Sequence, residues 1–560
     1  MVFKKNYFYG LSIAEEGYQQ TLKKEVAVLS IVAFLTMVTI LWFSFRSFGL
    51  LVVAMIFLIV VNILTLGFAQ LIGASLNVLT VTIPAIVGIV SMSDIIHVYT
   101  RYRQERAETK FADKIRYTYI DLNKSLALTS ITTAIGFMSL LFTDIEPFVH
   151  FGLVTAFGIF IAYLLTLFLL PVMLFISGNF NNKISFRMSE GTFKFIQNHA
   201  GKVVVCSLLL MVFSIYSGSK VQLNTYLYDD LDADDPLSQS LAFFEKNFFG
   251  IRDLELLVSV ADGKTVYDRE VISELERLDH YLKGKYGARD TYNVVTLLKR
   301  YNRAFYSGKP SKFSVPKNPV QLARLIDFIR NDAPGDPSGW LVSKQADFMR
   351  VYVKTTDEGS KVAKAKNKEL QTFIDQEMNS DVFQVQLSGQ PLFIDRSNEE
   401  ITRYLFKSLL GALTIIFLIV LLVYRSFRLA VIAFIPNILP MLLMLGLMYW
   451  LDISLKKSTA VVFTIAFGIA VDDTIHFISR FQCLLQQGST VSESLSKTWH
   501  STGKAILITS MVLIGGFGSF VFSSFQSTFL TGTLVSVALL TAVLSDLIVL
   551  PALLSRFYKE

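Results

Sequence analysis

Long runs of apolar residues alternate with short polar segments along most of the chain. A helix needs about 20 consecutive apolar residues to cross the hydrocarbon core of a bilayer. The sequence contains eleven runs of this kind, which predict eleven membrane-spanning helices. The runs fall near residues 26–45, 49–72, 77–99, 125–143, 148–177, 202–219, 405–424, 429–451, 457–479, 504–523 and 528–553.

The basic residues between the runs predict the orientation of the chain. The loops on one side carry 19 Lys and Arg residues, whereas the short loops on the other side carry only Lys456 and Lys457. Because Lys and Arg concentrate in cytoplasmic loops, the first set of loops is expected in the cytoplasm. The N-terminus and residues 220–400 are then expected on the opposite side of the membrane.

Residues 220–400 have the composition of a water-soluble domain, with 25 Lys and Arg and 28 Asp and Glu. Their periodicity predicts strands over 253–262 and 348–354 and helices over 269–286, 319–331 and 360–378. We therefore expect one α+β extramembrane domain. Its opening is acidic, and we interpret this run as a solvated connector rather than a cation site. The acidic residues are Asp229, Asp230, Asp232, Asp234 and Asp235.

An internal repeat relates the two groups of apolar runs. Offsets of 379 and 380 residues align residues 26–177, the first repeat, with residues 405–553, the second repeat. The aligned pairs include Arg46 with Arg425, Asp94 with Asp473, His97 with His476, Arg101 with Arg480, Lys124 with Lys504, Thr129 with Thr509, Ser130 with Ser510, Gly136 with Gly516 and Pro171 with Pro551. The corresponding basic loops lie on the same side, so the repeats are predicted to be parallel copies of one five-helix module, which is a known transporter plan.

The repeat also predicts the domain organisation. The predicted parts, in order, are the remnant of a first outer domain (1–25), the first bundle (26–177), a cytoplasmic linker (178–201), a further spanning helix (202–219), the outer domain (220–400) and the second bundle (401–560). A complete repeat would add a helix and an outer domain before the first bundle. Three explanations stay open: a truncated or split twelve-helix protein, a natural eleven-helix protein, or a separate upstream subunit.

Acidic residues occupy matched positions inside the predicted spans. Asp94 lies three residues before His97, and Asp473, which follows Asp472, lies three residues before His476. Each pair therefore shares a helix face. Charged side chains inside a bilayer are costly, face the bundle interior and mark ion or proton routes.

Hydroxyl side chains recur near these acids. Thr129, Ser130, Thr509 and Ser510 are candidate hydrogen-bond partners, or anchors for a chain of water molecules. The alternative is that the Asp and His side chains form a structural pair that holds helices together, and this alternative is stronger for the two histidines. Asp546 has no acidic counterpart in the first repeat, so we interpret it as a local structural residue.

The composition argues against several function classes. There is no Walker-A motif, and no Ser/His/Asp or Cys/His arrangement is evident, so an ATPase or hydrolase is unsupported and the chain is not expected to be an enzyme. Six His and two Cys leave little room for a metal centre, and no cofactor is expected. The net charge of +7 reflects orientation, because residues 101–124 also contain acids and are typical of an amphipathic helix on the membrane surface. Nucleic-acid binding is not expected.

These features resemble the resistance–nodulation–division (RND) superfamily. The similarity is carried by the two bundles, the Arg-Ser-Phe loops, the outer domain before the second bundle, and the motif Gly468–Phe477, which contains Asp472, Asp473 and His476. The chain is most similar to MMPL-type exporters, whose fold is related to that of Patched-like sterol-sensing proteins. The resemblance covers about residues 8–560.

The resemblance implies a multi-pass protein of the bacterial inner membrane that exports a hydrophobic or lipid-like molecule, driven by protons. Asp94, Asp472 and Asp473 would form the proton relay, and residues 220–400 would be the porter domain. Ser93 stands where a second Asp often occurs, so the relay would be asymmetric. The implied partners are protons, a lipid-like substrate, and either a second copy of the chain or an upstream subunit. The alternative is a non-transporting lipid- or sterol-sensing protein, or an inactive fragment of a split transporter.

Overall fold

All eleven predicted apolar runs lie in helices of the computed structural model, which describes residues 11–75, 77–104, 110–143, 145–176, 188–227, 230, 234–248, 250–333 and 339–558. Among these residues, ten helices are long and apolar enough to cross a membrane. The first run falls in α1 (Leu11–Phe45), where Val28–Ser44 is a shorter apolar stretch. Residues 1–10, residues 178–187 of the predicted cytoplasmic linker, and Asp229 and Asp232 of the acidic run lie outside the described residues.

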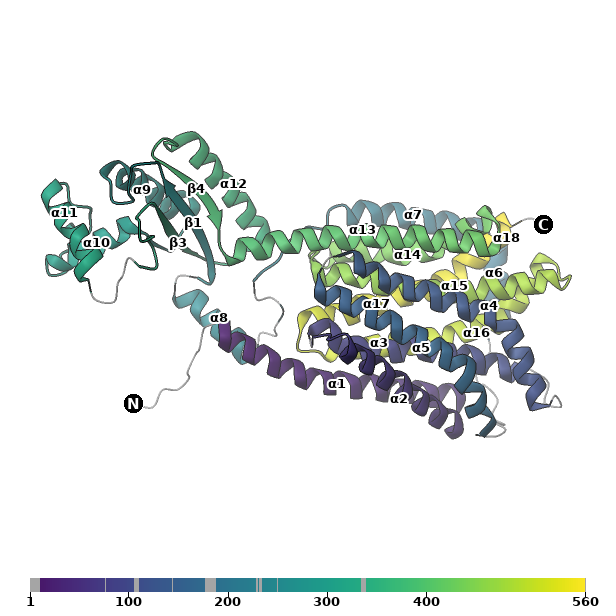
Figure 1. The fold of residues 1–560 in the computed structure, drawn as a ribbon. Coiled ribbons are helices and arrows are strands. Elements are labelled where there is room, and N and C mark those ends of the chain that lie inside the picture. Colours follow the sequence, from purple (N-terminus) through teal and green to yellow (C-terminus); the bar gives the residue numbers. More distant parts are fainter. Residues whose placement is uncertain are drawn as a thin grey trace. The chain divides into compact units, whose positions relative to one another are not determined.

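The helices of the two repeats, with α6 and α7 between them in sequence, form one compact unit, Glu16–Gln222 with Glu400–Glu560. Its long helices run side by side (Figure 1). The first repeat contains α1, α2 (Phe48–Leu71), α3 (Val78–Gln104), α4 (Phe111–Met138), η1 (Ser139–Thr143) and α5 (Glu146–Ile176), and α6 (Glu190–Asn198) and α7 (Ala200–Gly218) follow it. The second repeat contains α13 (Gln390–Tyr424), α14 (Phe427–Trp450), α15 (Lys457–Gln486), α16 (Val491–Gly518), η5 (Ser519–Phe522), α17 (Gln526–Leu544), η6 (Ser545–Val549) and α18 (Leu550–Phe557).

The repeat seen in the sequence is also present in three dimensions. Both α4 and α16 end in a short 3₁₀ turn at the same point of the repeat. A Cβ at Gly152 of α5 would lie 2.5 Å from the carbonyl oxygen of Phe137, and one at Gly532 of α17 would lie 2.6 Å from that of Phe517. The 380-residue offset relates both members of each contact, so glycine permits the same close helix approach in the two copies.

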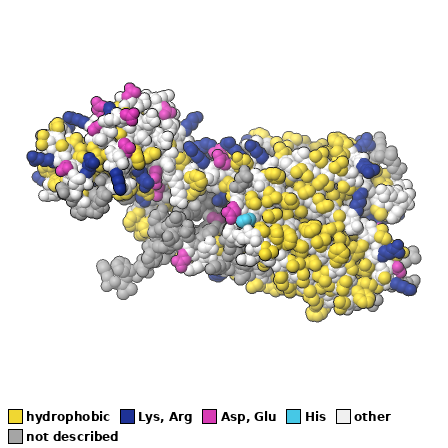
Figure 2. All heavy atoms as spheres, in the orientation of Figure 1, with side chains coloured by type: hydrophobic (Ala, Val, Ile, Leu, Met, Phe, Trp, Pro, Cys, Tyr) yellow, Lys and Arg dark blue, Asp and Glu magenta, His cyan; other side chains and the backbone are white. Residues whose placement is uncertain are grey.

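The helices that carry the predicted relay are the innermost ones. In the 18-residue apolar segment of α15 every residue is buried, and in that of α3 78% of the residues are buried. In the corresponding segments of α5, α7 and α13 only 28% of the residues are buried. Outer helices instead expose large apolar side chains such as Phe168 and Leu422. These side chains cover the visible face of the bundle, and Lys and Arg gather at the end near the C-terminus (Figure 2). The acidic motifs are therefore shielded from the lipid-facing surface.

The second compact unit contains the predicted extramembrane domain, Leu223–Glu399. Its four-stranded antiparallel sheet has the order β2-β3-β1-β4. The strands are β1 (Arg252–Val260), β2 (Asp290–Tyr292), β3 (Phe348–Thr355) and β4 (Phe383–Ser388). The helices are α8 (Pro236–Asn247), α9 (Arg269–Tyr281), η2 (Leu282–Tyr286), α10 (Val294–Phe305), η3 (Pro310–Lys312), α11 (Pro319–Asp327), η4 (Phe328–Asp332) and α12 (Ser360–Glu377).

Alternating burial along β1 places Leu254, Leu256 and Val258 in the core of this unit. They pack with the apolar faces of α9, α10 and α12. The five predicted elements are confirmed by β1, β3, α9 with η2, α11 with η4, and α12. Four further elements, α8, α10, β2 and β4, were not predicted from the sequence, and β2 has only three residues. An element that short depends on its pairing partner rather than on its own pattern.

Candidate functional site

The two repeats meet at a pair of stacked histidines in the bundle interior. His97 of α3 and His476 of α15 have ring centroids 3.9 Å apart, and their planes differ by 11°. Their side chains are buried, at 3% and 2% exposure. The His residues that the sequence aligned across the repeats are therefore direct neighbours in the structure.

Asp472 faces the histidine of its own helix. His476 Nε2 lies 3.3 Å from Asp472 Oδ1, one helical turn away. Ser93 Oγ, from the first repeat, donates to Asp472 Oδ2 at 3.1 Å. Ser93, the residue at which the sequence departs from the family pattern, is thus a direct partner of the second repeat's acid.

Asp473 faces the histidine of the other repeat. His97 Nε2 lies 3.7 Å from Asp473 Oδ1. Thr509 Oγ1 donates to Asp473 Oδ1 at 3.2 Å, and Ser510 Oγ donates to Oδ2 at 3.1 Å. This carboxylate therefore contacts two hydroxyls of its own repeat and an imidazole of the other.

Asp94 is the third buried carboxylate, and its 7% exposure equals that of Asp472 and Asp473. It interacts electrostatically with Asp472, across the interface between the repeats. The hydroxyl of Thr129 donates to the carbonyl oxygen of Leu126 on its own helix, at 3.0 Å. Ser130 is buried on the same helix. Hydroxyl contact with one of these carboxylates is thus present at Thr509 and Ser510. Thr509 also donates to the carbonyl oxygen of Ile506 on its own helix, at 2.8 Å, as Thr129 does to that of Leu126.

Asp546, which the sequence marks as a local structural residue, belongs to a second buried polar group next to this site, whose other members were not predicted. Thr474 Oγ1 donates to Asp546 Oδ1, and Asn437 Nδ2 donates to Thr474 Oγ1 at 3.0 Å. Asp546 is 1% exposed and lies in η6, a π-helical turn. Bulges of this type are frequent at functional sites. Asp546 is therefore bonded to the residue that follows Asp473, and the signal that could have revealed this is Asn437, a polar residue inside an apolar run.

A third group lies at the end of the bundle that carries the predicted cytoplasmic loops. Arg101 and Arg480, aligned by the repeat, both donate to Asp121 Oδ2, with Arg101 Nε at 2.9 Å and Arg480 Nη1 at 3.1 Å. The interpretation of residues 101–124 as one amphipathic helix on the membrane surface is wrong, because residues 101–104 end α3 and residues 111–124 begin α4. From Phe111 onward they form the first half of α4, because the helix continues without a break into its apolar half.

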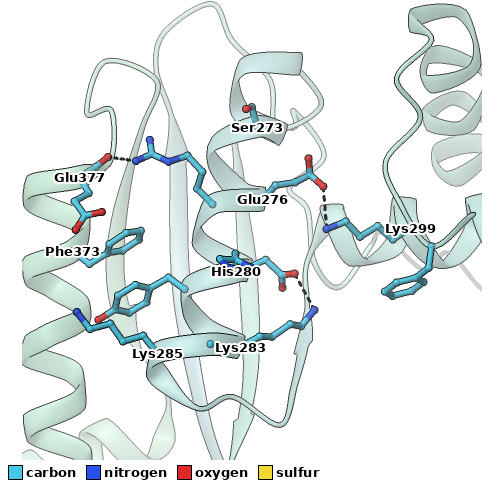
Figure 3. Close-up of a pocket in the computed structure, with 13 residues that line it drawn as sticks. Ser273, Glu276, His280, Lys283, Lys285, Lys299, Phe373 and Glu377 are labelled. Atoms are coloured by element: carbon cyan, nitrogen blue, oxygen red, sulfur yellow. Dashed lines mark hydrogen bonds and ion pairs between the residues drawn. The ribbon is translucent and has the colours of Figure 1, made fainter. Parts of the chain in front are cut away.

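The extramembrane unit has an open groove of about 880 Å³ along α9 (Figure 3). Most of its charged side chains are already paired. Lys299 Nζ lies 3.0 Å from Glu276, Lys283 Nζ lies 2.9 Å from Asp279, and Arg277 donates to the carbonyl oxygen of Glu377. The aromatic rings of Tyr281 and Phe373 stack at its edge, with centroids 4.0 Å apart.

Within the described part of the chain, no group of three or more His, Cys, Asp or Glu side chains is arranged to hold a metal ion. The carboxylates and imidazoles of the bundle lie in pairs, His97 beside Asp473 and His476 beside Asp472. Carboxylate and imidazole are the side-chain groups that most often exchange protons in proteins.

Comparison with known proteins gives a consistent fold assignment. The sequence profile of the MMPL family matches residues 7–214 and 272–557. The crystal structure of SecDF, a translocon-associated membrane protein from Thermus thermophilus, is similar with a TM-score of 0.60 and 13% identity, and a SecDF structure in the super-membrane-facing form gives 0.59 and 14%. Each similarity covers 96% of this chain and 62% of the SecDF chain, so this chain spans about three-fifths of the length of those proteins. No curated protein matches the sequence.

Proposed function

Because the chain belongs to the MMPL family of RND-type membrane transporters, we propose that it exports a hydrophobic or lipid-like substrate from the bacterial inner membrane by using the proton gradient. The family membership confirms the resemblance predicted from the repeats and the acidic motif. The direction of transport, the substrate class and the coupling to protons belong to the proposal.

The observation that carries the proposal is the set of buried carboxylates and imidazoles between the repeats. Unpaired charges in a bilayer interior are costly and are retained mainly for function. Here Asp472 and Asp473 each lie beside an imidazole, and the two imidazoles come from different repeats. Uptake or release of a proton by these groups therefore changes the charge at the repeat interface, and transfer between them redistributes it.

The stacked histidines supply a physical link from protonation to movement. Two unit charges about 4 Å apart repel each other by about 4 kcal/mol at an effective dielectric constant of about 20. Protonation of both His97 and His476, at a centroid distance of 3.9 Å, favours separation of α3 from α15 unless Asp472 and Asp473 are both ionised. Loading and release of protons would in this way rock one repeat against the other.

Each side chain has a defined part in this scheme. Asp473 accepts a proton from His97, and Thr509 and Ser510 stabilise its ionised form by donating hydrogen bonds. Asp472 accepts a proton from His476, and Ser93 stabilises the ionised form of Asp472 by donating a hydrogen bond. Asp94, through its interaction with Asp472, adds a third site at which a proton can be held.

The test is transport in proteoliposomes with and without an imposed pH gradient. An NBD-labelled phospholipid serves as the probe, and its leaflet is read from accessibility to dithionite. Asp473→Asn is expected to abolish gradient-driven movement while expression and folding survive. Asp452→Asn, which changes an exposed carboxylate of the same unit, is the matched control. Full transport by Asp94→Asn/Asp473→Asn would refute the proposal.

The alternative function is a non-transporting lipid- or sterol-sensing protein, or an inactive fragment of a split transporter. The aromatic edge of the groove along α9 offers an apolar surface that suits a lipid-binding role as well as a porter role. A sensing protein would bind the NBD-labelled phospholipid equally well with and without the gradient, and Asp473→Asn would leave that binding unchanged.

A further inference from the structure

A small polar cavity lies beside the stacked histidines, on the side of Arg101 and Arg480. Its volume is about 30 Å³, and residues of α3, α4, α15 and α16 line it, including both histidines. A polar space of this size holds about one to a few water molecules. The cavity therefore extends from the proposed relay toward the basic end of the bundle.

Two buried polar atoms of the lining call for a solvent partner. Thr100 Oγ1 and Arg480 Nε make no hydrogen bond within the part of the chain that the structure describes, and Thr100 is only 1% exposed. His97 Nε2 and His476 Nε2 have only the long Asp contacts of 3.7 and 3.3 Å. Buried polar groups are nearly always hydrogen-bonded to protein or water, so these atoms fit a cavity that holds water.

A charged cluster closes the far end of the cavity. Arg101, Asp121 and Arg480 line it, and their side chains are 16%, 18% and 23% exposed, which places them at the boundary with the surface. One carboxylate oxygen, Asp121 Oδ2, accepts hydrogen bonds from both guanidinium groups. Asp121 therefore places a negative charge between the two guanidinium groups at this end of the cavity.

The cluster joins the two repeats asymmetrically. Arg101 makes two hydrogen bonds to Asp121, at 2.9 and 2.5 Å, whereas Arg480 makes one at 3.1 Å. In the second repeat Ser501 occupies the position equivalent to Asp121. The bond between Asp121 and Arg480 is thus the weaker half of the cluster and the one that crosses between repeats.

We propose that this cavity is the water-filled outlet of the proton relay and that Asp121 closes it by holding the arginines of both repeats together. The proposal rests on the proposed function, because the outlet serves the same relay. When α3 and α15 move apart, Asp121 stays with Arg101 and releases Arg480, which opens the cavity to the solution on the basic side.

The test measures access to the cavity rather than transport. Thr100→Cys is introduced into the full chain with Cys206→Ser and Cys483→Ser, and inverted membrane vesicles are treated in parallel with a cationic and an anionic membrane-impermeant methanethiosulfonate reagent. Acceleration with both reagents reports access to the cavity rather than the charge of its outlet. Addition of Asp121→Asn is expected to accelerate labelling by about tenfold, the factor expected on loss of a charge-assisted hydrogen bond. Arg480→Gln is expected to accelerate it similarly, which keeps the test valid if Asp121→Asn fails to fold.

Two matched variants define the baseline. Asp113→Asn changes another carboxylate of α4 outside the cluster, and Thr464→Cys places a thiol at a fully buried position of α15 outside the cavity. Asp113→Asn is expected to leave the labelling rate of Thr100→Cys unchanged. Thr464→Cys is expected to stay unlabelled, with or without Asp121→Asn. Equal labelling of Thr100→Cys with and without the Asp121 and Arg480 substitutions would overturn the outlet. Because labelling needs neither substrate nor gradient, that result is distinguishable from a failure of Asp473→Asn to stop transport.

Discussion

The two repeats have corresponding helices but differ in the positions of their charged residues. The first repeat contributes one acid to the histidine site, Asp94, whereas the second contributes Asp472 and Asp473. At the basic end the relation is reversed, because the first repeat has Asp121 where the second has Ser501. Each repeat thus lacks a carboxylate that the other provides.

This difference explains why the polar contacts cross between the repeats. Ser93 reaches Asp472, His97 reaches Asp473, and Arg480 reaches Asp121, each across the interface. Symmetric repeats with an acid at every position would bring like charges together, which is unfavourable in a low-dielectric interior. Because the copies have diverged, one carboxylate, Asp121, accepts hydrogen bonds from an arginine of each repeat.

The largest expected effect comes from the acids of the second repeat. Asp473→Asn and Asp472→Asn should each lower gradient-driven transport of the NBD-labelled phospholipid by about 100-fold or more, the contribution typical of a positioned acid or base. Asp94→Asn should lower it less, because Asp94 acts through Asp472. Equal losses in all three variants would show that the repeats contribute symmetrically.

The next effect separates stacking from proton exchange at His97. His97→Phe keeps an aromatic ring against His476 but removes the nitrogen that faces Asp473. We expect the melting temperature in detergent to change little and transport to fall by about 10- to 100-fold. A variant that loses stability but transports normally once folded would assign the stack a structural role alone.

The helix contacts of the repeats also differ, and this can be measured as stability. A Cβ at Gly136 would lie 2.9 Å from the backbone Cα of Gly468, whereas one at Gly516 would meet the side chain of Ile89. Gly136→Ala should therefore destabilise the protein by about 2–3 kcal/mol, as overpacking does. Gly516→Ala should cost somewhat less, about 1–2 kcal/mol, because it meets a side chain rather than backbone, although Ile89 is buried and β-branched and can shift only a little.

Gly468→Ala serves as the internal control for that comparison. Its added Cβ would lie 3.7 Å from Gly136, an ordinary contact, so the melting temperature should remain close to that of the unmodified protein. A larger loss in Gly468→Ala than in Gly136→Ala would contradict the packing described for α4 against α15.

The smallest expected effect concerns Ser93, where the first repeat departs from the second. Ser93→Ala removes one hydrogen bond to Asp472 and should cost about 1 kcal/mol of stability. Ser93→Asp would place a second carboxylate beside Asp472 and should impair transport more than Ser93→Ala does. Improved transport in Ser93→Asp would indicate that the asymmetry of the acids is dispensable.

Much of the fold was predictable because the order of apolar and polar residues along a segment shows which side chains are buried. Apolar runs located every long helix, and the 379- and 380-residue offsets located the repeat, since each depends only on residues near one another in sequence or on direct comparison of two segments. The single charge-rich segment, residues 220–400, similarly identified the unit with the sheet. The shortest strand, β2, was missed because its stability comes from pairing with β3.

The site was predictable only as a set of residue types. The sequence selected Asp94, Asp472, Asp473, His97 and His476 because buried charge in an apolar helix is exceptional. It could not decide that Asp473 faces His97 instead of its own His476, or that Thr509 reaches Asp473 in addition to its own helix. Those contacts depend on how α3, α4, α15 and α16 are rotated against one another.

The sequence by itself therefore determined which segments are buried and which residues bear charge, and the tertiary structure decided which charges meet. Asp121 shows the reason most clearly. In sequence it stands in a segment with both signs of charge, typical of an amphipathic helix on the membrane surface. Only helix packing brings it between Arg101 and Arg480, whose positions differ from its own by 20 and 359 residues. Periodicity records the solvent that each side chain faces, whereas pairing over such separations is set by the packing of the whole bundle.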